Sequence, residues 1–323
     1  MRNFFAKIRK MKKRSRRWQM MDTTFGWRMS CVTVFLLAAT FMWALPAFAE
    51  GTQNPAVTPQ EETDETEVFF RRQKEANVPI IMYHLVTENS RYIGKYGIRP
   101  SQLEEDLKYL RDNGYNTVVM QDLIDFVVDG KRLPANPVVL TFDDGNSSDY
   151  KYLFPLLKQY EMKAVICIIG SAVDKMTEEH AKYPKGRYPN LNWAQVVEMH
   201  ESGLLEVQSH GYNVHGKAGS GRLKRESEGE YHSRLAADLT KLQGLCEEHL
   251  GYKPNTFCYP LGVISKESRA VLEELGFVAS LSCQEGINVI TYEDKACLFK
   301  LNRNNRPSGR SIEDVLKDIF QKS

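Results

Sequence analysis

Residues 138–145, with the sequence VVLTFDDG, join an apolar run to two adjacent carboxylates. Such a run is typical of a buried strand, in which successive side chains point to opposite faces. Asp143 and Asp144 should therefore point in different directions, so that one is free to hold a cation while the other faces a reacting atom. The competing interpretation is a strand that ends in a common Asp-Gly turn.

Two histidines follow a second apolar segment, residues 205–208. His210 and His215 are five positions apart, which is not the spacing of one helix face. A turn at a strand end can still bring the two rings together, and imidazole with a carboxylate suits zinc and neighbouring transition metals. We therefore predict a metal centre formed by Asp144, His210 and His215, with an open position of the catalytic kind. A surface histidine pair without function is the alternative.

The elements that must position these residues alternate between short apolar runs and helix-period segments. This order favours parallel strands with right-handed crossovers. We expect an α/β fold, a distorted (β/α) barrel of seven or eight units, with its site at the carboxyl ends of the strands. The expected strands are 78–86, 117–120, 138–142, 164–169, 205–208, 256–259, 278–281 and 297–301.

Amphipathic helices are predicted between these strands. Ser101 begins a capping box with Glu104, and Asn192 is placed to cap a second helix. A third helix carries Leu235, Leu239, Leu242 and Leu245, and a last one, starting near Ser311, carries Ile312, Val315, Leu316 and Ile319.

The amino terminus is of the secretory type. Residues 1–28 contain ten Lys or Arg and one Asp, and residues 29–49 carry no charge and end in Ala-Phe-Ala. This pattern predicts a signal peptide or a retained signal anchor over 1–49, then a polar linker over 50–77 and the barrel over 78–323. We expect a secreted or cell-surface protein that touches the membrane only through its amino-terminal segment.

Charge and cysteine content narrow the class of partner. The net charge of +2 includes +9 from residues 1–28, so the rest of the chain carries −7 and has no basic footprint for nucleic acid. Five cysteines with no close-paired spacing follow residue 49, which argues against a disulfide framework or a cysteine zinc site.

The combination of these motifs resembles the polysaccharide deacetylases of carbohydrate esterase family four. The likeness runs from about residue 78 to the end and includes the sequences TFDDG, NWAQ at 192–195, HGYNVH at 210–215 and FCYPLG at 257–262. The histidine spacing and the early sequence MYH at 82–84 are most similar to the secreted branch that includes poly-N-acetylglucosamine deacetylases.

The resemblance implies a role for each matched residue. Asp143 would be the general base, and His84 the general acid. Asp144, His210 and His215 would bind the divalent metal, most simply Zn²⁺, with Co²⁺ or another ion as alternatives. The backbone N–H of Leu261 would help to hold the oxyanion.

The sequence also departs from the family pattern. Gly211 stands where a Thr or Ser is usual, Leu261 where an aromatic residue is usual, and the arginine that orients the base is missing before the third motif. Arg303, just beyond the last expected strand, is the candidate replacement near the substrate-binding site, and a surface arginine without a role is the alternative. Tyr259, Tyr83, Tyr212 and Trp193 are candidates for stacking on sugar, and packing at the barrel edge is the alternative for each.

The expected function is thus an extracytoplasmic, metal-dependent N-deacetylase. Its partner would be an N-acetylated polysaccharide, either peptidoglycan or an exopolysaccharide. Two alternatives stay open: an inactive barrel that binds glycan or scaffolds a partner, and an O-acetyl esterase that uses the same residues.

Overall fold

The computed structural model describes residues 73–178 and 189–321. The predicted signal segment and residues 50–72 of the predicted linker lie outside these ranges. Within the described part of the chain, no helix has both the length and the apolar character needed to cross a bilayer.

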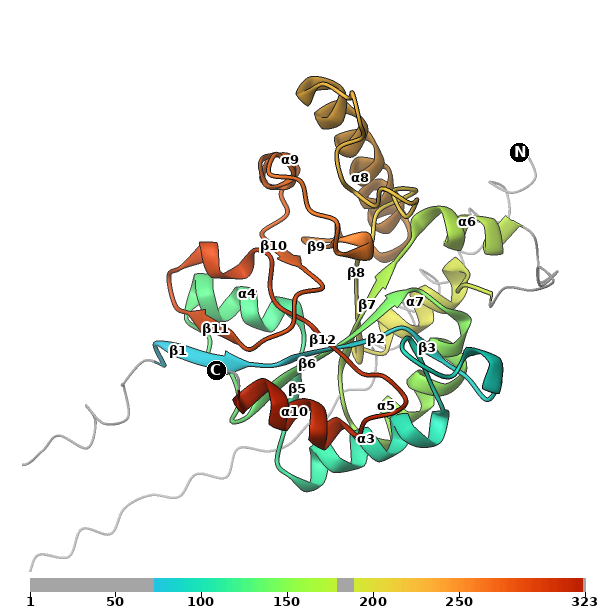
Figure 1. Cartoon of the computed structure of the whole chain (residues 1–323), viewed down its shortest axis with the longest axis vertical. Coiled ribbons are helices and arrows are strands. Elements are labelled where there is room, and N and C mark those ends of the chain that lie inside the picture. The colour runs from blue at the N-terminus through green and yellow to red at the C-terminus, as the bar shows by residue number, and fades with distance from the viewer. Residues whose placement is uncertain (1–72, 179–188, 322–323) are drawn as a thin grey trace, which may run out of the picture. The chain divides into compact units, whose positions relative to one another are not determined.

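Parallel strands form one curled sheet (Figure 1), with β6 near its middle. The order is β10-β9-β8-β7-β6-β2-β12, and β5 pairs with the start of β6. The sheet strands are β2 (Ile80–Tyr83), β5 (Asn116–Val118), β6 (Pro137–Asp144), β7 (Ala164–Ile168), β8 (Leu205–Ser209), β9 (Thr256–Cys258), β10 (Ala279–Leu281) and β12 (Asn304–Asn305).

The two edges of this sheet approach each other through a single parallel bridge. Leu281 in β10 pairs with Leu301, which lies just before β12 in the chain. The Leu301 N–H donates to Ser280 O (2.8 Å), and the Ser282 N–H donates to Leu301 O (2.8 Å). The prediction of a distorted (β/α) barrel is confirmed, with closure at this seam by one bridge.

Strand residues alternate between two apolar layers. On β6, Val138, Leu140 and Phe142 pack in one buried cluster with helices α3, α5, α7 and α10. Val139, between them, packs in a second cluster that includes residues of α4, β9 and β10. This alternation places neighbouring residues of β6 on opposite faces of the sheet as far as its last residues.

The helices follow the predicted apolar periodicity. They are α3 (Pro100–Asp112), α4 (Met120–Asp129), α5 (Phe154–Tyr160), α6 (Gly170–Glu178), α7 (Trp193–Glu201), α8 (Glu228–Leu250), α9 (Ser268–Glu274) and α10 (Ile312–Gln321). The Asn192 cap is confirmed, because its side chain accepts the Gln195 N–H (3.0 Å). The Ser101 cap is wrong: Pro100 occupies the first turn and Gln102 accepts the Arg99 N–H (3.0 Å), so the N-cap lies two residues earlier, at Arg99.

Two strand predictions need correction. The run 78–86 is divided into β1 (Glu75–Val78), β2 and β3 (Leu85–Val86), with Pro79, which has no N–H to donate, at the first break. The strand at 297–301 is wrong, because the Asp294 side chain accepts the Ala296 N–H (2.9 Å) and starts a 3₁₀ turn, η4 (Lys295–Leu298).

The boundary of the predicted linker is also corrected. Strand β1 pairs antiparallel with β11 (Asn288–Thr291), and Ala76 and Val78 are buried. The folded domain therefore includes residues that the polar composition placed in the linker. The remaining short elements are β4 (Gly97–Ile98), which pairs with β3, η1 (Ser90–Tyr92), the π-helical turn η2 (Asp149–Leu153) and η3 (Pro260–Gly262).

Candidate metal centre and active site

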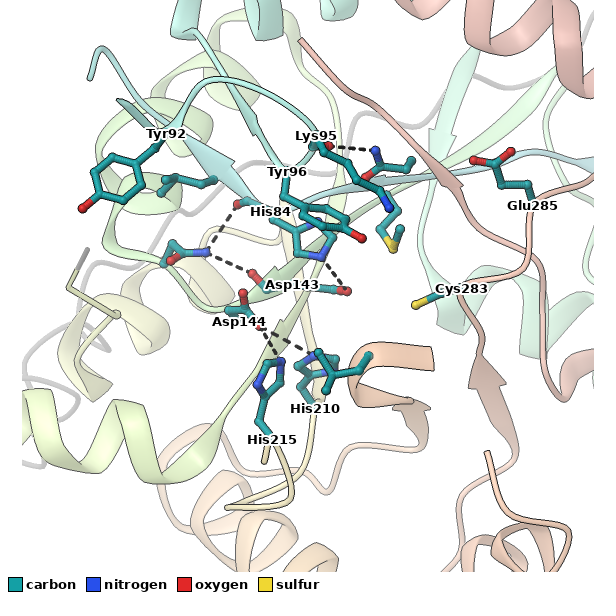
Figure 2. Close-up of a pocket in the computed structure, with 15 residues that line it drawn as sticks. His84, Tyr92, Lys95, Tyr96, Asp143, Asp144, His210, His215, Cys283 and Glu285 are labelled. Carbon is teal, nitrogen blue, oxygen red and sulfur yellow. Dashed lines mark hydrogen bonds and ion pairs between the residues drawn. The ribbon is translucent and has the colours of Figure 1, made fainter. Parts of the chain in front are cut away.

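A cavity of about 610 Å³ lies at the carboxyl ends of the central strands. His84 follows β2, Asp143 and Asp144 end β6, and His210 and His215 follow β8, and all five side chains line this cavity (Figure 2). The carboxyl ends of parallel strands meet at one rim, so residues more than 120 positions apart in the chain become neighbours here.

The three predicted metal ligands do converge. Asp144 Oδ1 lies 3.3 Å from His215 Nε2 and 3.7 Å from His210 Nε2. One ligand atom from each residue lies within 4.8 Å of the others. Asp144 Oδ1 is buried and has no hydrogen-bond partner in the described part of the chain. An unpartnered buried oxygen between two imidazoles fits a bound cation, since a buried polar atom is otherwise costly.

The tautomer of His210 follows from one hydrogen bond. His210 Nδ1 lies 2.8 Å from Cys258 O, and a carbonyl oxygen only accepts, so Nδ1 carries the proton. The Nε2 lone pair therefore faces Asp144, as a metal ligand requires. Burial lowers the pKa of His210, which favours the neutral, ligating form.

The backbone at the end of β6 separates the two carboxylates. Asp144 has φ of +75° and Gly145 has φ of +65°, so the chain leaves the strand sharply. Left-handed backbone costs an aspartate roughly 1–2 kcal/mol, and Asn190 braces it by donating its Nδ2–H to Asp144 O (2.9 Å). The predicted divergence is confirmed: Asp143 faces Arg303, and Asp144 faces His210 and His215.

Asp143 is buried against a buried arginine. Arg303 Nη1 donates to Asp143 Oδ1 (2.7 Å), and Arg303 Nε donates to Ser282 O (2.7 Å). Burial alone would raise the pKa of Asp143, but the charge of Arg303, with smaller contributions from His210 and His84, holds it well below the usual range. Asp143 is therefore ionised at neutral pH.

This geometry corrects one expectation about Arg303. Its side chain is fully buried behind Asp143 and does not line the cavity, so the prediction that it contacts substrate is wrong. Its placement fits the other expectation, that it replaces the missing arginine that orients the base.

His84 lies on the opposite side of Asp143 from Arg303. Its Nε2 is 3.8 Å from Asp143 Oδ2, and its side chain is 21% exposed. The ring of Tyr96 packs at 4.7 Å between centroids, tilted by 53°. His84 Nδ1 is buried without a hydrogen-bond partner among the described residues. His84 is thus held within the cavity, close to both the carboxylate and the open space.

Of the two roles expected for the four aromatic candidates, stacking on sugar or packing, the structure favours packing. Tyr259 is 1% exposed and its hydroxyl lies 2.8 Å from Ser268 Oγ, so it cannot reach a substrate. Tyr83 and Trp193 are also buried, and Tyr212, which is partly exposed, is not a lining residue of the cavity. The aromatic residues that do line it are Tyr92 and Tyr96.

Tyr92 and Tyr96 belong to the loop that follows His84, between β3 and β4. Their position just after the carboxyl end of a central strand is the signal that would have indicated them. Leu261 also lines the cavity, with φ of +57° and 56% exposure, so its segment faces the open space. The role of its N–H stays a prediction.

The sequence of this chain matches a known protein family. The polysaccharide deacetylase family model matches residues 130–280, which include Asp143, Asp144, His210 and His215. Residues 130–280 of this chain thus resemble a polysaccharide deacetylase domain. His84 and Arg303 lie outside the matched segment, so their placement in the cavity and behind Asp143 comes from the tertiary structure.

Individual relatives agree with this family. A poly-beta-1,6-N-acetyl-D-glucosamine N-deacetylase of Escherichia coli K12 is 29% identical over 75% of this chain. The aligned segment covers 39% of that relative, so this chain spans well under half its length.

Solved structures show the same fold. A de-N-acetylase from Aggregatibacter actinomycetemcomitans is 27% identical with a TM-score of 0.65, over 76% of this chain and all of that one (100%). IcaB from Ammonifex degensii is 25% identical with a TM-score of 0.59, over 76% of this chain and 96% of that chain.

Proposed function

We propose that this protein is an extracytoplasmic, metal-dependent N-deacetylase. Its substrate would be the acetamide of N-acetylglucosamine residues in a cell-wall or exported polysaccharide. One observation carries the proposal: a metal-type triad, an ionised carboxylate and a histidine line a single cavity. Similarity to the E. coli poly-beta-1,6-N-acetyl-D-glucosamine N-deacetylase supports the amide and the sugar, and similarity to the A. actinomycetemcomitans de-N-acetylase supports the amide.

The donor set favours zinc as the resident ion. Asp144, His210 and His215 would hold it, with two imidazole nitrogens and one carboxylate oxygen, a ligand set of the catalytic zinc type. A divalent cation there supplies a Lewis acid for the amide carbonyl and makes a nearby water more acidic.

The remaining residues supply the proton transfers. Asp143 takes a proton from the attacking water as the water oxygen adds to the carbonyl carbon. His84 donates a proton to the amide nitrogen as the C–N bond breaks, which releases acetate and a free amine on the sugar. Arg303 keeps Asp143 ionised and fixes its orientation. The Leu261 N–H is the proposed donor to the oxyanion.

The extracytoplasmic location rests on the amino-terminal sequence alone. The basic segment and the uncharged run of residues 29–49 support export. The proposed substrates, cell-wall and exported polysaccharides, also lie outside the cytosol. A fusion of residues 1–49 to a reporter that is active only outside the cytosol tests it.

The proposed chemistry is tested by acetate release from N-acetylglucosamine oligomers with added Zn²⁺ or Co²⁺. Asp143→Asn should lower kcat roughly 10²–10⁴-fold, because the base is lost, while metal binding persists. His84→Gln serves as a second variant outside the ion pair with Arg303, and should also lower kcat about 10²-fold or more. Asp129→Asn, an exposed site on α4, is the matched control.

Other outcomes point to the alternatives. Release of acetate from O-acetylated but not N-acetylated glycans would replace the amidase function with an esterase. Glycan binding without turnover, equal in wild type and Asp143→Asn, would indicate an inactive barrel.

A further inference from the structure

One side chain of helix α8 accepts hydrogen bonds from the backbone of the loop between the two histidines. Asp238 Oδ1 accepts the Tyr212 N–H (2.7 Å), and Asp238 Oδ2 accepts the Asn213 N–H (2.7 Å). Both oxygens of one carboxylate thus bind consecutive backbone amides. Such charge-assisted hydrogen bonds are about twice as strong as neutral ones.

Gly211 makes this close contact with α8 feasible. Its φ is +83°, and an added Cβ would lie 2.3 Å from Val214 Cγ2 and 3.1 Å from Asp238 Oδ1. A side chain here would push the loop away from the carboxylate. Glycine therefore supplies no hydroxyl to brace the loop, and the brace comes from Asp238 instead.

The opposite side of the loop is held against α6 by side-chain and backbone hydrogen bonds. The Tyr212 hydroxyl donates to Asp174 Oδ2 (3.1 Å), and the Ser171 hydroxyl donates to Asn213 Oδ1 (3.3 Å). Gly211 O accepts the Gly170 N–H (3.1 Å), and Tyr212 O accepts the Ser171 N–H (2.8 Å), both at the start of α6. Val214 is buried in the cluster that contains Leu235 and Leu239 of α8. The segment is therefore fixed between two helices, and Asp238 is the side chain that holds its amides.

We propose that Asp238 is a positioning residue that sets His215 relative to His210 for metal binding. The inference rests on the proposed metal-dependent function. The Nε2 atoms of the two histidines lie 3.3 and 3.7 Å from the same oxygen, Asp144 Oδ1, so a small shift of the loop breaks their convergence. Partners one step removed from metal ligands typically change affinity roughly 10–100-fold when they are mutated.

The test measures the affinity of the full chain for Zn²⁺ by chelator competition and the visible spectrum of the Co²⁺-loaded protein. Asp238→Ala should weaken Zn²⁺ binding about 10–100-fold and alter the Co²⁺ spectrum. Asp238→Asn keeps one acceptor oxygen and turns an NH₂ group toward the other amide, so it should give a smaller loss. Glu248→Ala, exposed on the same helix, is the control and should match wild type.

The outcomes separate the two proposals. If wild type binds Zn²⁺ and both Asp238 variants bind it equally well with an unchanged Co²⁺ spectrum, the positioning role is wrong while the proposed function stands. If wild type itself binds no metal, the proposed function fails and the inference fails with it. Should Asp238→Ala fail to fold, the Asp238→Asn measurement decides.

Discussion

Among single residues, Arg303 determines the charge environment of Asp143. It comes from the end of the chain, yet its guanidinium provides the positive charge that the buried Asp143 needs. Burying one charge is strongly unfavourable unless a partner of opposite charge is buried with it. Sequence reasoning singled out this arginine, but only the folded structure shows that it lies behind the carboxylate and not against the substrate.

Replacing Arg303 by Met should therefore destabilise the protein by about 3–5 kcal/mol, because Asp143 would remain as an unpaired buried charge. The measurement is urea unfolding at neutral pH. The double variant Arg303→Met with Asp143→Asn should recover part of that loss, since it removes both charges. Equal losses in the single and double variants would contradict the ion-pair explanation.

Among the secondary-structure elements, the turn after β6 contains a buried carboxyl group without a hydrogen-bond partner in the described residues. Asp149 begins the π-helical turn η2 and is fully buried, and neither carboxylate oxygen has a hydrogen-bond partner in the described part of the chain. Burial, followed by the charge of Asp144, raises the pKa of Asp149 well above its ordinary value of 3.8. The carboxyl group is thus held largely in its neutral form as the pH rises above that value.

A raised pKa in the folded state makes stability depend on pH. The folded form retains its proton where the unfolded chain has lost it, so Asp149 contributes stability below about pH 4 that is lost as the pH rises. This loss of stability amounts to at most about 1.4 kcal/mol per pH unit. Because asparagine does not titrate, Asp149→Asn should abolish it and make the protein more stable than wild type at neutral pH. Urea unfolding from pH 4 to 8, with the exposed Asp129→Asn as control, checks this. Parallel pH curves for wild type and Asp149→Asn would refute it.

At the scale of the whole domain, contacts distant in sequence complete the fold. The bridge between Leu281 and Leu301 joins the edges of the main sheet, and β1 pairs with β11 more than 200 residues away. Polar composition alone assigned part of β1 to a linker. Pairing with β11 buries Ala76 and Val78 and makes the strand part of the domain.

Deleting β1 should therefore lower stability. The free energy of unfolding of a chain that starts at Pro79 should be about 2–4 kcal/mol lower than that of a chain that starts at Gln73. The shorter chain lacks the buried side chains of Ala76 and Val78. Thermal and urea unfolding of the two truncated chains measure this difference. Identical stabilities would show that the β1–β11 pair contributes nothing to the domain.

Local sequence patterns were sufficient to predict the fold class, the convergence of Asp144, His210 and His215, and the divergence of Asp143 and Asp144. These depend on local patterns, such as strand alternation, helix periodicity and polar residues at strand ends. The tertiary structure alone decided that Arg303 lies behind Asp143, that Tyr92 and Tyr96 replace Tyr259 at the cavity, and that Asp238 holds the histidine loop. Such contacts join segments far apart in the chain, and their geometry depends on packing that no local pattern encodes.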